Sequence, residues 1–236
     1  MTPTRGKPPP HALATGHDHE HWLRMWRKGQ TDFHQDAVNP LLERFWRRPP
    51  QAGPGRIFVP LCGKSLDMLW LAAQGNEVIG VELSPVAVKA FFAENGLSPT
   101  RLKRGKFTLY EHGRLHILCG DFFRLTTAEL GDIDMVYDRA ALTALPESLR
   151  ERYVAHLRAI VPPACPIFLV TMADADADPL DAPADDIDEE IRTLYTHHFA
   201  IDMAHMEAGT ETDCRGAADA QYAVEHKVYR LTPHPK

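Results

Sequence analysis

The chain has 236 residues, 44% of them hydrophobic, and a formal net charge of −6 at pH 7, which fits one domain with a full core. Because the charge is negative and no basic stripe appears, nucleic acid is not an expected partner. No apolar run approaches the roughly 20 residues of a membrane span, the polar N-terminus lacks the apolar core of a signal peptide, and the four scattered cysteines form no Cys-x-x-Cys pair, so we expect a reduced, cytoplasmic protein.

The N-terminal residues divide into a tail and a histidine-rich segment. Residues 1–16 are rich in proline, glycine and threonine and are predicted to be disordered, which leaves residues 17–236 as a single domain. His17, His19 and His21 alternate with acidic residues, and imidazoles bind zinc or nickel. No cysteine or second spaced histidine pair completes a tetrahedral set, so a solvated helix start is favoured and no metal is predicted.

A helix is predicted to begin at Asp18, which can act as its N-cap. Trp22 and Trp26 lie four residues apart and therefore share one face. One interpretation is an amphipathic helix that fills the core with tryptophan. The other is a lid over a ligand, which the following polar loop and its aromatic Phe33 favour. A short helix over residues 38–46 then leads to the sheet.

The most informative stretch alternates strand, turn, helix and strand. Residues 57–59 form an apolar run that stops at a proline, as a buried parallel strand does. Gly63 permits a tight turn, and residues 64–74 carry apolar side chains at helical spacing. A second buried strand, residues 78–81, ends at the acidic Glu82. This order is typical of a nucleotide-binding α/β sheet, and Glu82 stands where such folds place a ribose-binding acid.

Two familiar nucleotide motifs are excluded at this turn. A P-loop needs a glycine five positions before Gly63, where Phe58 stands. The dinucleotide fingerprint needs three glycines, and residues 60–63 offer one. The bulky side chains of Leu61 and Cys62 leave little room for a pyrophosphate. By exclusion, a nucleoside without phosphates is expected, with S-adenosylmethionine as the leading candidate, and its positively charged sulfonium would be attracted to tryptophan ring faces.

The next segment supplies a third parallel strand and a second candidate contact. A helix is predicted over residues 86–94 and strands over residues 107–110 and 115–118, the last of them parallel to the central pair. Asp121 and Phe122 follow. A carboxylate and an aromatic ring suit the edge and the face of adenine. A capping aspartate with core phenylalanines behind it fits the same residues equally well.

Residues 132–137 are predicted to form a further strand that leads into Asp138 and Arg139. Ligands in open α/β sheets bind beyond the carboxyl ends of strands, so both side chains are expected to face the site. Arg139 then pairs with an anionic group or with the carboxylate of the ligand. In the alternative interpretation it forms a structural ion pair with a neighbouring acid.

The remaining elements complete the sheet: a helix over residues 146–160, a strand over 167–172, a helix over 187–197 and an antiparallel strand pair over 199–206 and 221–231. The acidic stretch 173–190 lacks the glycine and glutamate of a calcium loop and is interpreted as solvated. The fold class is therefore predicted as α/β: a doubly wound, Rossmann-like, seven-stranded sheet. The sheet is mostly parallel, with a C-terminal antiparallel hairpin and an N-terminal helical lid.

Four motifs carry a family resemblance: Trp22-x3-Trp26-x2-Gly29-x3-Phe33-His34, Phe58-Val-Pro-Leu-Cys-Gly-Lys-Ser65, Gly80-Val-Glu-Leu-Ser84 and Asp138-Arg-Ala-Ala-Leu142. In these motifs the chain resembles the bacterial type of the thiopurine S-methyltransferase family, which are class I S-adenosylmethionine-dependent methyltransferases. The resemblance implies an enzyme that methylates the sulfur of thiopurines and aromatic thiols. Selenium and tellurium compounds are further acceptors that it implies.

Carried over position by position, the resemblance implies cofactor contacts from Trp22, Trp26, Leu61, Glu82, Asp121, Phe122 and Arg139. In this assignment Glu82 holds the ribose hydroxyls and Phe33 covers the substrate ring. Arg139 and Arg215 border the substrate pocket as orienting, charge-stabilising catalytic residues that favour the thiolate.

The sequence departs from the family at residues 181–186, which replace a Gly-Pro-Pro-Phe-like segment on the substrate side. Two rival classes are considered. A nicotinamide-dependent oxidoreductase should show the three-glycine turn. A non-catalytic S-adenosylmethionine-binding protein would keep Glu82 and Trp26 but lack an acceptor pocket. No stretch argues for an oligomer, so we expect a monomer.

Overall fold

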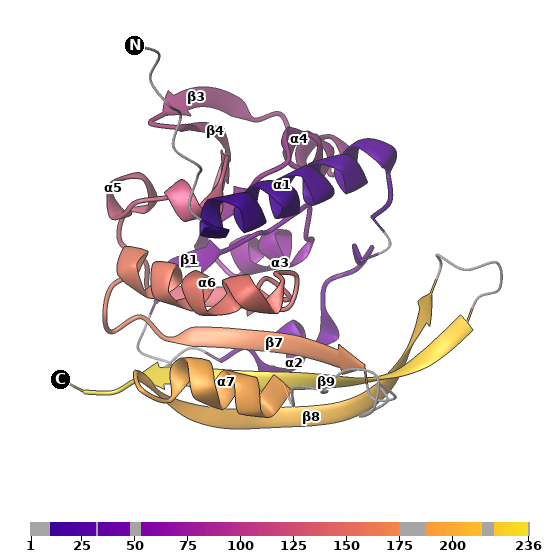
Figure 1. The fold of residues 1–236 in the computed structure, drawn as a ribbon. Helices are drawn as coiled ribbons and strands as arrows, with labels where there is room; N and C mark the ends of the chain where they lie inside the picture. The colour runs from indigo at the N-terminus through magenta and orange to yellow at the C-terminus, as the bar shows by residue number, and fades with distance from the viewer. Residues whose placement is uncertain (1–9, 32, 48–52, 175–186, 214–219, 236) are drawn as a thin grey trace, which may run out of the picture.

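Nine strands form one mixed sheet with helices on both faces (Figure 1). The computed structural model describes residues 10–31, 33–47, 53–174, 187–213 and 220–235. The strands are β1 (Arg56–Val59), β2 (Glu77–Glu82), β3 (Thr100–Arg104), β4 (Phe107–His112), β5 (Leu115–Cys119), β6 (Met135–Arg139), β7 (Ile167–Asp174), β8 (Phe199–Asp213) and β9 (Ala220–Pro233). The helices are α1 (Pro10–Lys28), α2 (Pro40–Phe45), α3 (Asp67–Ala73), α4 (Pro85–Glu94), the 3₁₀ turn η1 (Phe122–Arg124), α5 (Thr127–Leu130), α6 (Glu147–Ile160) and α7 (Ile187–Tyr195).

The strand order, β3-β4-β5-β2-β1-β6-β7-β9-β8, places a parallel unit at the centre of the sheet. β5, β2, β1, β6 and β7 run parallel. β4 and β3 continue antiparallel beyond β5, and β9 and β8 do so beyond β7. From β1 the chain first builds outward through β2 and β5, and later on the other side through β6 and β7. This reversal is a switch point of the kind where α/β sheets bind ligands.

The prediction of a seven-stranded sheet is wrong, because β4, which matches the predicted strand over residues 107–110, and the unpredicted β3 extend the sheet beyond the parallel strands. β3 has the sequence Thr-Arg-Leu-Lys-Arg, and four of its five residues are exposed. Such a segment shows no apolar alternation, so the sequence does not mark it as a strand. Basic side chains are typical of an edge strand that avoids pairing with other chains.

Alternate residues of the central strands point to opposite faces, which gives two hydrophobic clusters. In β1, Phe58 belongs to one cluster, whereas Ile57 and Val59 belong to the other. The first cluster includes buried residues from α5, α6 and α7, and the second includes buried residues from α2, α3 and α4. Helices therefore cover both faces, as a doubly wound sheet requires.

Helix α1 begins at Pro10, so the predicted start at Asp18 is wrong. Ala12, Leu13 and Ala14 are strong helix formers. Proline is tolerated at the start because its missing N–H has no helical partner there. Figure 1 shows α1 crossing in front of the sheet near α4, and the two helices are in contact. Within the described residues, neither α1 nor any other helix is long and apolar enough to cross a membrane.

The predicted C-terminal antiparallel pair is confirmed, with longer strands than expected. β8 continues to Asp213 and β9 starts at Ala220, so the pairing runs into the arm that protrudes from the sheet in Figure 1. Residues 175–186, which include the departure from the family pattern, lie outside the described residues. The loop that carries Arg215 does so too.

Gly120, which follows β5, packs closely against the side chain of Phe107. A Cβ atom added there would lie 2.5 Å from Cδ1 of the fully buried Phe107. We therefore expect Gly120→Ala to lower the free energy of unfolding by about 1–3 kcal/mol, measured by chemical denaturation. Gly53→Ala is the matched control, because nothing lies within 4 Å of its added Cβ. An equal loss in both variants would contradict this packing.

Candidate active site

A cavity of about 280 Å³ lies at the carboxyl ends of β1, β2 and β6, where the switch point predicts a ligand. Its volume is near the lower end for small-molecule pockets, roughly 300 Å³. Helix α1 and the loop after it form another wall. The lining includes all the predicted cofactor residues and the predicted substrate residue Phe33: Trp22, Trp26, Phe33, Leu61, Glu82, Asp121, Phe122 and Arg139.

The turn between β1 and α3 is tight, and two of its backbone amides already donate hydrogen bonds within the protein. Leu61 has a φ of 46°, a value that residues with a side chain rarely adopt, and Gly63 has a φ of 53°. The amide of Cys62 donates to the carbonyl of Val81 at 3.0 Å. The amide of Gly63 donates to the carboxylate of Glu82 at 2.9 Å. A phosphate cradle needs free amides, so this turn is unsuited to a phosphorylated dinucleotide.

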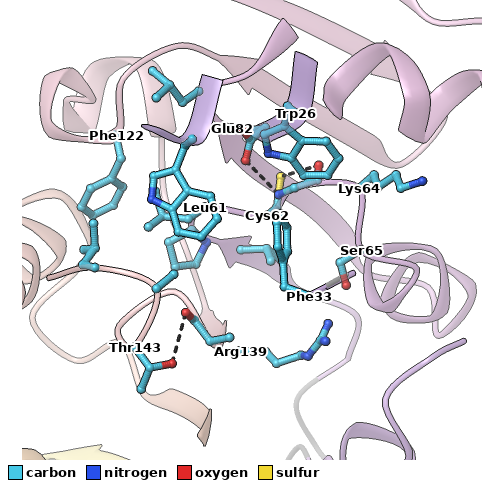
Figure 2. A pocket seen from close by; sticks show the side chains of 18 of the residues that line it. Trp26, Phe33, Leu61, Cys62, Lys64, Ser65, Glu82, Phe122, Arg139 and Thr143 are labelled. Carbon is cyan, nitrogen blue, oxygen red and sulfur yellow. Dashed lines mark hydrogen bonds between the residues drawn. The ribbon is translucent and has the colours of Figure 1, made fainter. Parts of the chain in front are cut away.

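Glu82 ends β2, and it is only 6% exposed in the wall of the cavity. Its Oε2 accepts the hydrogen bond from Gly63, and its Oε1 accepts one from the amide of Ser84 at 2.7 Å. Figure 2 shows Glu82 beside Cys62 and Trp26. Burial raises the pKa of Glu82 to about 7, although these backbone hydrogen bonds act to lower it. Each carboxylate oxygen can accept a second hydrogen bond. The geometry suits two neighbouring hydroxyls, such as those of a ribose.

Asp121 and Phe122 follow β5, and the interpretation of a capping aspartate with a core phenylalanine is confirmed. Oδ1 of Asp121 accepts from the amide of Phe123 at 2.9 Å and caps η1. Phe122 is 2% exposed and belongs to the first hydrophobic cluster. Both residues also line the cavity. Figure 2 shows Phe122 across the cavity from Lys64 and Ser65.

Three aromatic rings from α1 and the loop after it form one wall of the cavity. The ring of Phe33 meets Trp22 edge-on with 5.3 Å between centroids, and Trp26 with 5.6 Å. Phe33 is 47% exposed, whereas Trp26 is 7% exposed. A Cβ atom added at Gly63 would lie 3.3 Å from the indole of Trp26. Glycine at this position therefore serves both the positive φ and the close approach of the ring.

Helix α1 also brings Asp18 and His19 to the cavity, two residues that were not predicted to contact the cofactor or the substrate. They lie one helical turn before Trp22, and this spacing is the signal that could have found them. Nε2 of His19 lies 3.5 Å from Oδ1 of Asp121. Burial acts to raise the pKa of Asp121, but its donors and cations, His19 first, lower it. In the described part of the chain, no three His, Cys, Asp or Glu side chains are grouped to hold a metal ion.

Arg139 reaches the cavity from the last residue of β6 and also belongs to an ion pair. Its Nη1 lies 3.5 Å from Oδ2 of Asp67, which is fully buried. The two interpretations of Arg139 therefore do not exclude each other. Figure 2 shows Arg139 and Phe33 on the side of the cavity away from Phe122. The other predicted substrate residue, Arg215, lies outside the described residues.

His34 and Lys64, also without a predicted role, line the cavity. Nζ of Lys64 lies 2.8 Å from Oε2 of Glu94. Burial, followed by the charge of Lys64, lowers the pKa of His34. The imidazole is therefore neutral at pH 7.

The expectation that Asp138 faces the site is wrong. β6 continues to Arg139, two residues beyond the predicted strand, and alternate side chains of a strand point to opposite faces. Tyr137 and Arg139 line the cavity. Asp138 is buried on the other face, where it accepts hydrogen bonds from the hydroxyl of Tyr153 at 2.6 Å and the amide of Ala141 at 3.1 Å. Burial raises the pKa of Asp138 to about 6.

Known proteins resemble this chain in sequence and in fold. The family model described as "Thiopurine S-methyltransferase (TPMT)" matches residues 17–234. The thiopurine S-methyltransferase of Stutzerimonas stutzeri (strain A1501) is 57% identical over 218 residues, which cover 92% of this chain and 92% of that protein.

Two solved structures share the fold at low identity. A SAM-dependent methyltransferase from Anabaena variabilis has a TM-score of 0.58 at 14% identity, covering 92% of this chain and 95% of that chain. The 1,6-didemethyltoxoflavin-N1-methyltransferase of Burkholderia thailandensis, with bound 1,6-didemethyltoxoflavin and S-adenosylhomocysteine, has a TM-score of 0.52 at 16% identity, covering 98% and 93% of the two chains.

The cavity residues fit S-adenosylmethionine, the methyl donor named in the description of the Anabaena variabilis structure. The turn after β1 holds no free phosphate cradle, the buried Glu82 suits a ribose, and the rings of Trp22 and Trp26 suit a sulfonium. The chain therefore belongs to the thiopurine S-methyltransferase family, and S-adenosylmethionine is its cofactor.

Proposed function

We propose that this protein transfers the methyl group of S-adenosylmethionine to the sulfur of a thiopurine or another aromatic thiol, with selenium and tellurium compounds as further acceptors. The observation that carries the proposal is that one cavity is lined by residues suited to each of the two reactants. Glu82 and the tryptophan rings fit the methyl donor. Phe33 and Arg139 offer an aromatic face and a positive charge to an acceptor.

On the donor side, Glu82 accepts hydrogen bonds from the ribose hydroxyls, and Asp121 and Phe122 contact the edge and the face of the adenine. Trp22 and Trp26 present their rings to the sulfonium, so α1 acts as a lid. Leu61 packs beside the adenosine. Arg139 also pairs with the carboxylate of the cofactor. When bound, S-adenosylmethionine supplies a methyl group on a positively charged sulfur, and the acceptor displaces this sulfur from the methyl carbon in line.

On the acceptor side, Phe33 covers the substrate ring, while Arg139 and Arg215 favour the thiolate over the thiol electrostatically. Thiols on electron-poor heteroaromatic rings ionise near neutral pH. The protein therefore needs no strong general base, and it contributes alignment and exclusion of water.

The proposal is tested by incubating the protein with isotopically labelled S-adenosylmethionine and 6-mercaptopurine, thiophenol or selenite in parallel. Transfer of label to the thiols, identified by mass spectrometry, is the expected result. Cofactor binding without transfer to any acceptor would favour the non-catalytic alternative. The oxidoreductase alternative is not supported, because the amide of Gly63 already donates to Glu82.

Cofactor binding is expected to weaken about tenfold between about pH 8 and about pH 6. Burial raises the pKa of Glu82 to about 7 in the free protein, and the ionised carboxylate is the form that accepts from both ribose hydroxyls. The ionised fraction falls about tenfold over this range, and the apparent Kd rises by the same factor.

The measurement is calorimetric titration with S-adenosylhomocysteine at each pH. Glu82→Gln is the control, and its Kd should be nearly independent of pH. Burial also raises the pKa of Asp18, which lines the same cavity. An unchanged slope in the glutamine variant would assign the titration to another group and contradict the prediction.

A further inference from the structure

Asp67, the first residue of α3, lies buried behind the side of the cavity that Arg139 forms, and it is not part of the cavity lining. Its side chain is 1% exposed. A buried carboxylate is stable only when its oxygens are paired or hydrogen-bonded. The partners of Asp67 therefore show what the carboxylate holds in place.

Three groups from two separate parts of the chain contact this carboxylate. Oδ1 accepts a hydrogen bond from the backbone amide of Asn39 at 2.7 Å. Oδ2 accepts from the hydroxyl of Tyr137 at 2.8 Å and lies 3.5 Å from Nη1 of Arg139. Burial and the charge of Asp67 raise the pKa of Tyr137 well above its usual range, so its hydroxyl stays protonated and donates.

Arg139 approaches Asp67 through one terminal nitrogen. A guanidinium carries five N–H donors in a fixed plane. One contact to Asp67 therefore orients the plane and leaves other donors for the cavity, which Arg139 lines. Arg139 is only 17% exposed, so Asp67 also compensates a cation that is largely removed from water.

The contact with Asn39 ties the same carboxylate to the segment that carries Phe33. The side-chain amide of Asn39 donates to Oε1 of Gln35 at 3.3 Å. Gln35 directly follows Phe33 and His34, which both line the cavity. Through these contacts one carboxylate joins the aromatic and the cationic parts of the same cavity wall.

We propose that Asp67 is a positioning residue for the methyl acceptor, which fixes the guanidinium of Arg139 and the Phe33 segment relative to each other. The ring and the charge then meet the same acceptor molecule. This inference rests on the proposed function, in which Phe33 and Arg139 contact the acceptor. Asp67 itself touches neither ligand.

The test is a double-mutant cycle between Asp67→Asn and Arg139→Gln. Asparagine keeps the shape and still accepts from the amide of Asn39, but it removes the charge that orients Arg139. The readouts are kcat/KM for 6-mercaptopurine and the calorimetric Kd of this thiol in the presence of S-adenosylhomocysteine. In the wild-type background we expect Asp67→Asn to lower kcat/KM about tenfold and to raise the Kd of the thiol about tenfold. In the Arg139→Gln background we expect both changes to be less than about twofold.

Glu190→Gln is the matched control. Glu190 is 12% exposed and pairs with Arg150 at 2.6 Å, and neither residue lines the cavity. We expect it to lower Tm as Asp67→Asn does, while thiol binding and kcat/KM stay within about twofold of wild type. A loss of the same factor for Asp67→Asn in both backgrounds would overturn the inference. Wild-type protein that binds S-adenosylhomocysteine but no thiol would refute the proposed function, and the inference with it.

Discussion

Replacing Glu82 with alanine is expected to raise the Kd of S-adenosylmethionine by about 100-fold or more. The carboxylate is buried and held by the amides of Gly63 and Ser84, so it faces the ligand with its acceptors already oriented. A hydrogen bond to a charged group contributes about 1.5–3 kcal/mol. Loss of two such bonds to a ribose costs at least about 3 kcal/mol, which is roughly 100-fold in Kd.

Calorimetric titration with S-adenosylhomocysteine measures this loss without turnover. Glu77→Ala is the matched control, because Glu77 begins the same strand and pairs with Arg56 at 3.1 Å at the end away from the cavity. Its Kd should stay within about twofold of wild type. If the two alanine variants bound the ligand equally well, Glu82 would have no contact with the ribose.

The position of Glu82 is the part of the site that the sequence predicts best. Two short apolar runs define β1 and β2, and their parallel pairing brings Val59 opposite Gly80. The turn and the acidic tip must then meet at the same edge of the sheet. Because the strands and the turn are short, local pattern alone leaves little freedom for this carboxylate.

The wrong placement of Asp138 shows how an error of two residues changes a site. The predicted strand stops at Tyr137, which leaves Asp138 and Arg139 in a loop where both can face the ligand. In the structure β6 includes both residues, and alternation sends them to opposite faces. Strand ends are set by pairing with β7, which local sequence does not reveal.

Contacts between distant segments are the part of the site that pattern cannot predict. The carboxylate of Asp67 meets groups 28 and 70 residues away in sequence. A buried aspartate at the start of a helix has the same local signature as an exposed one. His19 approaches Asp121 only because α1 extends across the sheet, and the cavity wall becomes apparent only from that arrangement.

Replacing Trp26 with alanine is expected to affect both stability and cofactor binding. Trp26 is 7% exposed and packs against Phe33 and over Gly63. Removal of a buried tryptophan side chain lowers the free energy of unfolding by about 3–5 kcal/mol, and the open cavity beside this ring places the expected loss at about 3 kcal/mol. A desolvated ring facing a sulfonium contributes about 2 kcal/mol, so Kd should rise roughly 30-fold.

Trp26→Phe is the control, because it keeps a ring face while losing volume. Chemical denaturation and calorimetric titration with S-adenosylmethionine and with S-adenosylhomocysteine, whose sulfur is neutral, separate the two effects. If the ring acts on the sulfonium, Trp26→Ala weakens binding of the cofactor more than that of its product with the neutral sulfur, and Trp26→Phe restores most of the difference. A variant that loses stability but binds both ligands as wild type would make Trp26 a core residue alone, because a ring that only fills space has no means of sensing the charge on the sulfur.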